Sequence, residues 1–320
     1  MKKLVTIAVA AALAAPLAAA ANPTLYGRVN VNLVHEDTDF FEDGSSEAWD
    51  VQNNASRVGV KGSEDLGNGL TAVYQFEFGV DASDSGDVSG RLAYAGIAGG
   101  FGVFAMGRQW TPYYNTVDKT DIMQINGMND SYIGPSRIGN AVAYITPTFN
   151  GLTGTLALVI DNNGDAGDLA EVLNLGNTGD DGVDMINASV DYSNGPISAG
   201  VSYLGLEGDW DISIWGLGGK YTIGNFALIG QYENADDLDV DAWRVGGEVY
   251  LGSNTLRAVY GSVDAGSDYD SWAIGVEHNF SKRTRVFAEY EDSELNGLWS
   301  AELGAGAEQQ RFGVGIRHDF

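Results

Sequence analysis

The chain alternates apolar and polar residues with a period of two along most of its length, a pattern typical of β-strands with one apolar face. The first predicted strand places Leu25, Val29 and Leu33 on one side and Arg28 and Asn30 on the other. Three later segments repeat the pattern, with these apolar sides: Ile186, Ala188, Val190 and Tyr192; Trp272, Ile274, Val276 and Phe280; Phe312, Val314, Ile316 and Phe320. An all-β protein is therefore predicted, with one strand face suited to hydrocarbon and the other to water.

The connections between the predicted strands alternate in length. Short turns rich in Gly, Asn or Pro lie at Gly67–Gly69, Gly99–Gly102, Pro147–Gly151, Asn194–Pro196, Ile223–Asn225, Gly252–Asn254 and Ser281–Thr284. Long, mostly acidic connections lie at Glu36–Asn54, Asp81–Gly90, Trp110–Ser136, Asp161–Gly182, Glu207–Asp211, Asp236–Asp241, Ala265–Asp270 and Ser293–Gln309. Seven short and eight long connections join about 16 strands, and short turns at one end with long loops at the other are typical of outer-membrane barrels.

The stretch Trp110–Ser136 breaks the alternation and is too weakly periodic for a long helix. Thr111 followed by Pro112 suits the cap and first position of a short helix. A loop this long inside a compact domain is usually functional or disordered. Its many apolar residues argue against disorder, because they must pack on something. We predict that this third long loop folds back into the lumen of a barrel and narrows it.

Two architectures fit alternating strands, namely a transmembrane antiparallel β-barrel and a soluble, exported β-sandwich. After the N-terminal region, no stretch approaches the roughly 18 consecutive apolar residues that a membrane helix needs. Aromatic residues recur near the strand ends on the apolar faces, as in interfacial girdles. A terminal strand ending at Phe320 leaves an exposed sheet edge unless it pairs with the first strand. Both features favour the closed transmembrane barrel.

The N-terminus has the pattern of an export signal, with a basic start, an apolar run over residues 4–17 and a group of alanines. We predict that residues 1–21 are removed, with cleavage after Ala20 or Ala21 equally compatible with the pattern. Residues 22–320 are then a single barrel domain. The absence of cysteine excludes disulfide scaffolds and cysteine metal sites.

The chain carries 44 acidic and 17 basic residues, a formal net charge of −27, and loss of the two lysines of the predicted signal leaves −29. Such a charge repels nucleic acid, whose binding needs clustered Lys and Arg, and it attracts cations. The 44 glycines are spread through the alternating strands, where they permit the bends and close approaches of a curved sheet.

Several stretches, taken in order, resemble the trimeric general-porin family of Gram-negative outer membranes. They are LYGR at Leu25–Arg28, SRVGVKGSEDLGNGLTAVYQFE at Ser56–Glu77, RLAYAG at Arg91–Gly96, GRQ at Gly107–Gln109, RIGNAVAYITPTFNGL at Arg137–Leu152, and the terminal Phe320. The resemblance implies 16 antiparallel strands, a homotrimer, and a third loop folded into the pore. It further implies a passive outer-membrane diffusion pore for ions and small hydrophilic solutes, with lipids, lipopolysaccharide and the outer-membrane assembly machinery as expected partners.

In this family, acidic residues of the third loop face basic residues of the wall. By position in the motifs, the wall residues are Arg28, Arg57, Arg91 and Arg137, the loop acid is Asp121, and Phe320 is the assembly signal. Ser89 stands where some members carry another basic residue, and Ile125 stands where they carry a second loop acid. The electric field across the pore, between the loop acids and the wall bases, is therefore expected to be weaker or shifted toward Asp118. The alternating pattern supports this position for Arg28, which lies on the polar face of its strand. That face is expected to line the lumen, because a charged side chain that faces lipid at mid-membrane costs about 2–4 kcal/mol.

Other chemistry finds little support in the sequence. DNNGDAGDLAEV at Asp161–Val172 resembles a calcium loop, yet Ala166 and Val172 stand where that loop needs Gly and Glu. Three scattered histidines form neither a metal spacing nor a catalytic triad. We therefore predict no metal, no cofactor and no enzymatic activity. A second functional class stays open, a non-conducting outer-membrane barrel that acts as an adhesin or structural anchor through its acidic loops.

The sequence makes opposite predictions for ion selectivity at two places. The predicted wall arginines favour anions, whereas the acidic loops favour cations. Above roughly 0.1 M salt the Debye length is about 10 Å or less, so that only charges at the constriction still act on passing ions. We therefore expect a mild cation preference in dilute salt that fades or reverses as salt rises.

Overall fold

The computed structural model describes residues 23–320 apart from 41–43, 126–131, 161–181, 207–211 and 296–306. The strands are β1 (Thr24–Phe40), β2 (Ser45–Asn53), β3 (Arg57–Gly67), β4 (Leu70–Val80), β5 (Val88–Gly99), β6 (Gly102–Trp110), β7 (Arg137–Ile138), β8 (Ala141–Ile145), β9 (Leu152–Ile160), β10 (Val183–Asn194), β11 (Ile197–Leu206), β12 (Ile212–Ile223), β13 (Phe226–Ala235), β14 (Val240–Leu251), β15 (Asn254–Asp264), β16 (Asp268–Asn279), β17 (Thr284–Leu295) and β18 (Ala307–Asp319). The two short helices are α2 (Pro112–Val117) and η1 (Asp236–Leu238). No helix among these described residues is both long and apolar enough to cross a membrane.

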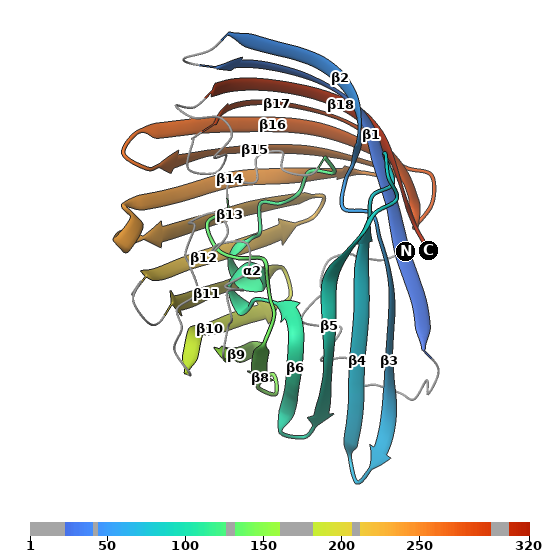
Figure 1. The fold of residues 1–320 in the computed structure, drawn as a ribbon, viewed down its shortest axis with the longest axis vertical. Coiled ribbons are helices and arrows are strands. Elements are labelled where there is room, and N and C mark those ends of the chain that lie inside the picture. Colours follow the sequence, from blue (N-terminus) through green and yellow to red (C-terminus); the bar gives the residue numbers. More distant parts are fainter. Residues whose placement is uncertain (1–22, 41–43, 126–131, 161–181, 207–211, 296–306) are drawn as a thin grey trace.

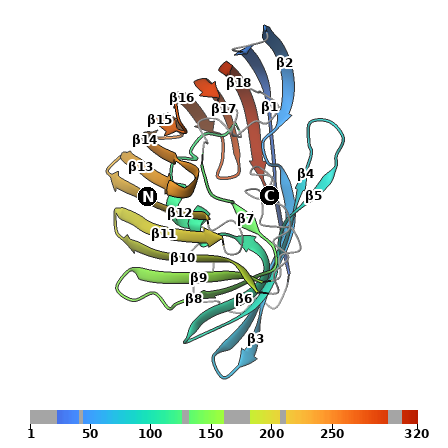
Figure 2. The same ribbon diagram turned by 60° about the vertical axis from the view of Figure 1, so that its left-hand side comes forward.

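The sheet is antiparallel and closes on itself, because β1 pairs with β18 from Arg28 opposite Asp319 to Phe40 opposite Ala307. β2 and β3 both pair with β1, so they are two parts of one strand, interrupted where Ala55 has a φ of 52°. β7 and β8 both pair with β6 and likewise form one strand. The eighteen segments are therefore a closed barrel of 16 strands, as predicted, whose wall curves around α2 (Figures 1 and 2).

The two faces of the wall differ as the alternation predicts. Val190 and Ile274 are 51% and 50% exposed on the outward face. On the inward face, Asn187 and Glu233 are fully buried and Glu289 is 2% exposed. Apolar side chains thus cover the outside, as hydrocarbon requires, while polar side chains line the inside.

Aromatic rings form a row on the outward face, near the end of the wall with the long loops. Neighbouring strands contribute the pairs Trp215–Tyr232, Trp243–Tyr260 and Trp272–Tyr290, with ring centroids 5.4, 5.5 and 5.3 Å apart. Amphipathic rings of this kind sit at the boundary between hydrocarbon and headgroups. The row therefore marks one membrane interface.

All seven predicted short turns join adjacent strands, but strands extend into two of the predicted long loops. β1 continues to Phe40 and β2 starts at Ser45, within the predicted connection Glu36–Asn54. Likewise, β17 continues to Leu295 and β18 starts at Ala307, inside the predicted Ser293–Gln309. These strands extend beyond the apolar band, where both faces can be polar, so the loss of alternation did not mark the strand end. The predicted signal peptide, the calcium-like segment at 161–172 and the loop at 207–211 lie outside the described residues.

Candidate pore constriction

The third long loop starts with the short helix α2, as the Thr-Pro sequence predicts. The Thr111 hydroxyl accepts a hydrogen bond from the Tyr114 N–H at 2.9 Å, and Pro112 occupies the first turn. The same hydroxyl donates to the Pro135 carbonyl at 2.8 Å, which ties the start of the loop to its end. The Thr111 side chain therefore caps the helix and also joins the beginning of the loop to its end.

α2 packs on a patch of the inward wall that is built from glycine. A Cβ added to Gly200 would lie 2.6 Å from Thr116 Cγ2, and one added to Gly218 would lie 2.3 Å from the Val117 carbonyl oxygen. A Cβ on Gly216 would lie 2.6 Å from the hydroxyl of Tyr113, a residue of α2. Side chains at these positions would push the helix away from the wall, so glycine is what allows the close approach.

Polar side chains of β10 hold α2 against the inward face of the wall. The Asn187 side-chain oxygen accepts the Tyr113 N–H at 2.9 Å, and the Asp191 carboxylate accepts the Thr116 hydroxyl at 2.9 Å. Because Asn187 is fully buried, its hydrogen bonds are formed without competition from water. The helix is thus bonded to the wall through one backbone N–H and one side-chain hydroxyl.

Two neighbouring residues of β13 hold the loop after α2. The Gln231 side-chain oxygen accepts the N–H groups of Lys119 and Thr120 at 3.0 and 3.1 Å, and the Thr120 hydroxyl at 2.7 Å. The Glu233 carboxylate accepts the Ile133 N–H at 3.0 Å. These two side chains therefore bind both the outgoing and the returning part of the loop.

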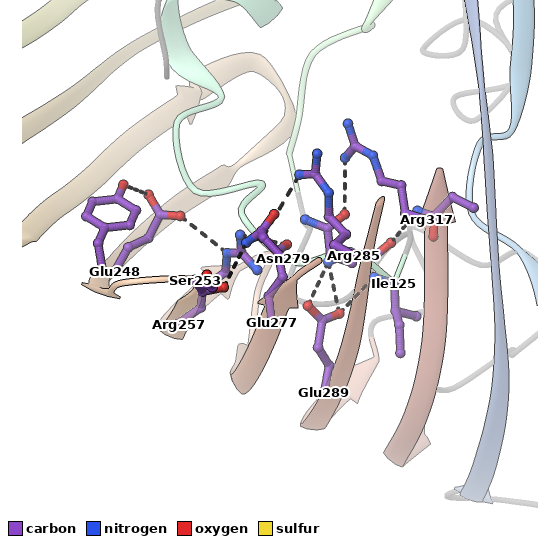
Figure 3. Close-up of polar contacts among 12 residues, drawn as sticks. Ile125, Glu248, Ser253, Arg257, Glu277, Asn279, Arg285, Glu289 and Arg317 are labelled. Carbon is purple, nitrogen blue, oxygen red and sulfur yellow. Dashed lines mark hydrogen bonds and ion pairs between the residues drawn. The ribbon is translucent and has the colours of Figure 1, made fainter. Parts of the chain in front are cut away.

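After β10 and β13, a third strand anchors the loop by hydrogen bonds, namely β17 across the lumen (Figure 3). The Glu289 carboxylate accepts the N–H groups of Gln124 and Ile125 at 2.8 Å. The Gln124 carbonyl accepts a hydrogen bond from Asn30 at 3.1 Å, and its side-chain oxygen accepts one from Arg317 at 3.1 Å. The described loop residues thus contact the inward face on β10–β13 at one end and on β17, β18 and β1 at the other.

Three of the predicted wall arginines lie together on β1, β3 and β5. Arg28 and Arg57 are direct cross-strand partners. Glu77 on β4 pairs with Arg91 at 2.8 Å and with Arg57 at 3.7 Å, while Arg28 pairs with Asp319 at 2.9 Å. The basic wall, defined as Arg28, Arg57, Arg91 and Arg137, is therefore partly neutralised by carboxylates that sequence reasoning did not assign.

Arg137 joins this group through an aromatic ring. The guanidinium carbons of Arg137 and Arg91 lie 5.0 and 5.5 Å from the centroid of the Trp110 ring. Trp110 in turn stacks on Tyr114 of α2 with centroids 4.6 Å apart. Two arginines of the basic wall are thus coupled by cation–π contacts to the ring at which the loop begins.

The two predicted loop acids lie between the anchored points. Asp118 follows the last residue of α2, and its N–H donates to the Tyr114 carbonyl at 3.2 Å. Burial lowers the pKa of the neighbouring Lys119 amine, while the nearby carboxylates of Asp191 and Asp118 oppose this shift. Asp121 is exposed, on the stretch between the anchors Gln231 and Glu289. Ile125, in the position of a second loop acid, is instead buried.

The sequence analysis did not identify a second set of bases, which lies on β12 and β15–β18 and joins the basic wall at Asp319. Ion pairs continue around the lumen as Lys220–Glu248 (2.6 Å), Arg257–Glu248 (3.3 Å), Arg257–Glu277 (3.0 Å), Arg285–Glu277 (4.0 Å), Arg285–Asp319 (3.1 Å) and Arg317–Asp319 (3.2 Å). Figure 3 shows the part of this series of ion pairs from Glu248 to Arg317. The sequence contains a feature that could have indicated these bases, because each of them occupies a polar position of an alternating strand. Among the described residues, no group of three or more His, Cys, Asp or Glu side chains could hold a metal ion.

A closed antiparallel barrel with an apolar exterior, a polar interior and a loop bonded across that interior defines an outer-membrane pore protein. Residues 6–298 match the family model described as Gram-negative porin, and the chain belongs to this family. The chain is 28% identical over 369 aligned positions to the major outer membrane protein P.IB of Neisseria meningitidis, with all of both chains covered.

Two solved structures share the fold. One is an anion-selective porin from Comamonas acidovorans, with a TM-score of 0.73, 23% identity and coverage of 93% of this chain and 99% of that chain. The other is the trimer form of OmpT of Vibrio cholerae, with a TM-score of 0.60, 19% identity and the same coverage. Membership of the family makes this chain an outer-membrane diffusion pore for small solutes, located in the outer membrane of a Gram-negative bacterium.

Proposed function

We propose that the chain forms a homotrimeric pore whose narrowest opening lies between the loop residues 112–125 and the basic wall. The observation that carries this proposal is the attachment of the loop to two sides of the lumen, through Gln231 and Glu233 on β13 and Glu289 on β17. Solutes then pass beside the loop, where the opening sieves them by size and nearby charges act on them at close range. This role needs neither a cofactor nor a catalytic group.

The charges along the proposed passage favour anions. The four arginines of the basic wall are joined by Lys220, Arg257, Arg285 and Arg317 on strands β12 and β15–β18. The acids that pair with these bases or lie on the loop are fewer, namely Glu77, Glu248, Glu277 and Asp319 on the wall and Asp118 and Asp121 on the loop. The inward carboxylates of Asp191, Glu233 and Glu289 are left out of this comparison, because they are occupied by hydrogen bonds from the loop. The loops at the mouth carry the opposite sign, so the selectivity of the pore depends on salt. The related fold of an anion-selective porin agrees with a positive constriction.

Conductance of the purified protein in a planar lipid bilayer tests the proposed function. We expect discrete conductance steps that appear in groups of three, since each trimer inserts three parallel pores. A protein purified in the same way but denatured by heat serves as the control. A folded trimer without conductance would instead support the adhesin or anchor role, and single isolated steps from a folded protein would contradict the trimer.

We further propose that residues 1–21 are removed on export and that residues 22–320 form the mature barrel. Alternation begins directly after the alanine-rich segment, which supports this boundary. The intact mass of protein purified from outer membranes distinguishes cleavage after Ala20 from cleavage after Ala21. Lipids, lipopolysaccharide and the assembly machinery are the partners that such a location supplies.

Deletion of Phe320 is expected to cause a large loss of the folded trimer. The residue closes the barrel, because its N–H and carbonyl both bond to Gly27 at 3.0 Å. Its ring also covers Gly27, where an added Cβ would lie 2.3 Å from the Phe320 Cζ atom. We propose that the assembly machinery reads this terminal residue.

The heat-modifiable trimer band on a cold gel measures this effect. Phe320→Trp is the matched control, since it keeps an aromatic terminus and the backbone bonds to Gly27. A full yield of trimer from the deletion would remove the support for Phe320 as an assembly signal.

A further inference from the structure

The turn that joins β16 to β17 differs in charge from the other short turns of the barrel. It carries Lys282 and Arg283, whereas none of the six other short turns, all within the described residues, contains a Lys or Arg between its strands. Both side chains are exposed. Because the chain has a formal net charge of −27, two adjacent exposed bases make this turn an isolated positive point at the short-turn end of the wall.

The backbone of this turn is fixed by hydrogen bonds that leave the two basic side chains out. The Ser281 hydroxyl accepts the N–H groups of Arg283 and Thr284 at 3.1 and 3.0 Å. The Arg283 carbonyl accepts the Asp319 N–H at 2.8 Å, which ties the turn to the end of β18. The two bases are therefore held at a defined place on the barrel.

The acids at the neighbouring strand ends do not neutralise these bases. Glu277 and Asp319 lie on the inward face, where they pair with Arg285 at 4.0 and 3.1 Å. The ion pairs among the described residues include neither Lys282 nor Arg283. The positive charge of the turn is thus available to an external anion.

Two histidines extend the positive turn onto the outward face of the wall. His278 on β16 and His318 on β18 are both exposed, and these strands flank β17 about 10 Å from each other. The His278 Nδ1 atom lies 2.8 Å from the Asn254 side-chain oxygen, and the His318 Nδ1 atom lies 2.9 Å from the Thr284 hydroxyl. These bonds orient both rings, and no described residue bonds to either Nε2 atom. Each Nε2 atom can therefore serve a ligand as a hydrogen-bond donor.

Aromatic residues place these side chains at the level of the lipid headgroups. Phe280 and Phe320 are 67% and 45% exposed on the same face, at the ends of β16 and β18. Such rings lie at the boundary between hydrocarbon and headgroups, and in barrels of this kind the short turns are periplasmic. The terminal residue adds one negative charge, but the Phe320 carbonyl oxygen is bonded to the Gly27 N–H, on the β1 side of β18. The face toward β17 therefore keeps its positive charge.

We propose that Lys282, Arg283, His278 and His318 form a binding site, the basic turn patch, for the phosphate headgroup of an anionic phospholipid of the periplasmic leaflet. The two bases supply charge and the two imidazoles supply hydrogen bonds to phosphate oxygens. A soluble anion below the membrane reaches the turn, but only a lipid headgroup also reaches imidazoles on the lipid-facing side of the wall. Each base near an anionic lipid contributes about fivefold to binding. The patch therefore selects anionic over zwitterionic lipid at one point of an otherwise acidic protein.

Photocrosslinking from two matched aromatic positions tests the site. p-Benzoylphenylalanine replaces Phe280 in one variant and Phe226 in another, because Phe226 is likewise 56% exposed at the short-turn end but its turn carries no base. The folded proteins are placed in vesicles of equal amounts of phosphatidylglycerol and phosphatidylethanolamine, and mass spectrometry identifies the crosslinked lipid. We expect the ratio of phosphatidylglycerol to phosphatidylethanolamine adducts at position 280 to exceed that at 226 by roughly an order of magnitude. Equal ratios at the two positions would overturn the proposal.

Charge variants show whether the patch causes this preference. Lys282→Gln and Arg283→Gln, each made in the variant with the probe at position 280, should lower the adduct ratio about fivefold. Lys61→Gln removes the same charge from an exposed base on the lumen side, over the Tyr26 ring, and should leave the ratio unchanged. An unchanged ratio in both turn variants, or an equal loss in the Lys61 variant, would contradict the assignment.

Crosslinking in growing cells distinguishes the proposed ligand from other partners. The probe at position 280 should capture phospholipid in the outer membrane, with phosphatidylglycerol enriched over its share of the membrane lipids. Adducts with peptidoglycan fragments in place of lipid would assign the turn to the cell wall and overturn the proposal. Adducts with a second copy of the chain, and none with lipid, would make the patch a subunit contact and overturn it as well.

Discussion

Replacing Glu289 with alanine is expected to raise the single-channel conductance and to make the open current noisy. The carboxylate accepts two loop N–H groups at 2.8 Å in a site that is 2% exposed. Hydrogen bonds to a charged group contribute about 1.5–3 kcal/mol each, so removal of both destabilises the loop position by several kcal/mol. The bonds of the loop to Gln231 and Glu233 remain, so α2 stays on the wall. The stretch near Ile125 keeps only the bonds of Gln124 to Asn30 and Arg317, and we expect it to move.

Glu289→Gln separates the role of the acceptor from that of the charge. Glutamine keeps one acceptor oxygen on a side chain of similar length, so the conductance of this variant should lie between those of the wild type and the alanine variant. Asp292→Asn is the control on the same strand, since Asp292 forms no described hydrogen bond to the loop. The wild-type conductance from a folded Glu289→Ala trimer would show that the bond to β17 does not set the opening.

The fold was readable from the sequence because lipid and water impose opposite demands on the two faces of each strand. Val190 and Ile274 meet hydrocarbon, while Asn187 faces the lumen, and a period of two records this difference directly. The prediction failed where that demand ends. β1 extends through Glu36 to Phe40, beyond the apolar band, where paired backbones stabilise a strand whatever its side chains are.

The site was less readable, because its contacts join residues far apart in the chain. Motif resemblance pointed to Arg28 and Arg91, but their partners depend on the register of neighbouring strands. Arg28 and Asp319 are separated by 291 positions, and Glu289 and the Gln124 N–H by 165. No local pattern encodes such pairs. Alternation shows only that a side chain faces the lumen, which is why the anchors of the loop could not be predicted.

Neutralising two arginines of the basic wall is expected to shift the selectivity of the pore toward cations at every salt concentration. In the double variant Arg57→Gln and Arg91→Gln, Glu77 loses both of its ion-pair partners, at 3.7 and 2.8 Å, and contributes an uncompensated negative charge. The shift persists in concentrated salt, because ions pass these groups within contact range. The zero-current potential across a fixed salt gradient, at two mean concentrations, measures it. Glu77→Gln is the matched control and should shift the potential toward anions.

The acidic mouth should act differently. Asp236 and Asp237 belong to the short helix η1 between β13 and β14, at the end of the wall with the long loops, and neither forms a described ion pair with the basic wall. Above roughly 0.1 M the Debye length is about 10 Å or less, so Asp236→Asn with Asp237→Asn should reduce cation preference in dilute salt and have no effect in concentrated salt. Wild-type anion preference already present in dilute salt would show that the basic wall controls permeation alone. An effect of the η1 variant that persists in concentrated salt would instead place the selective charges at the mouth.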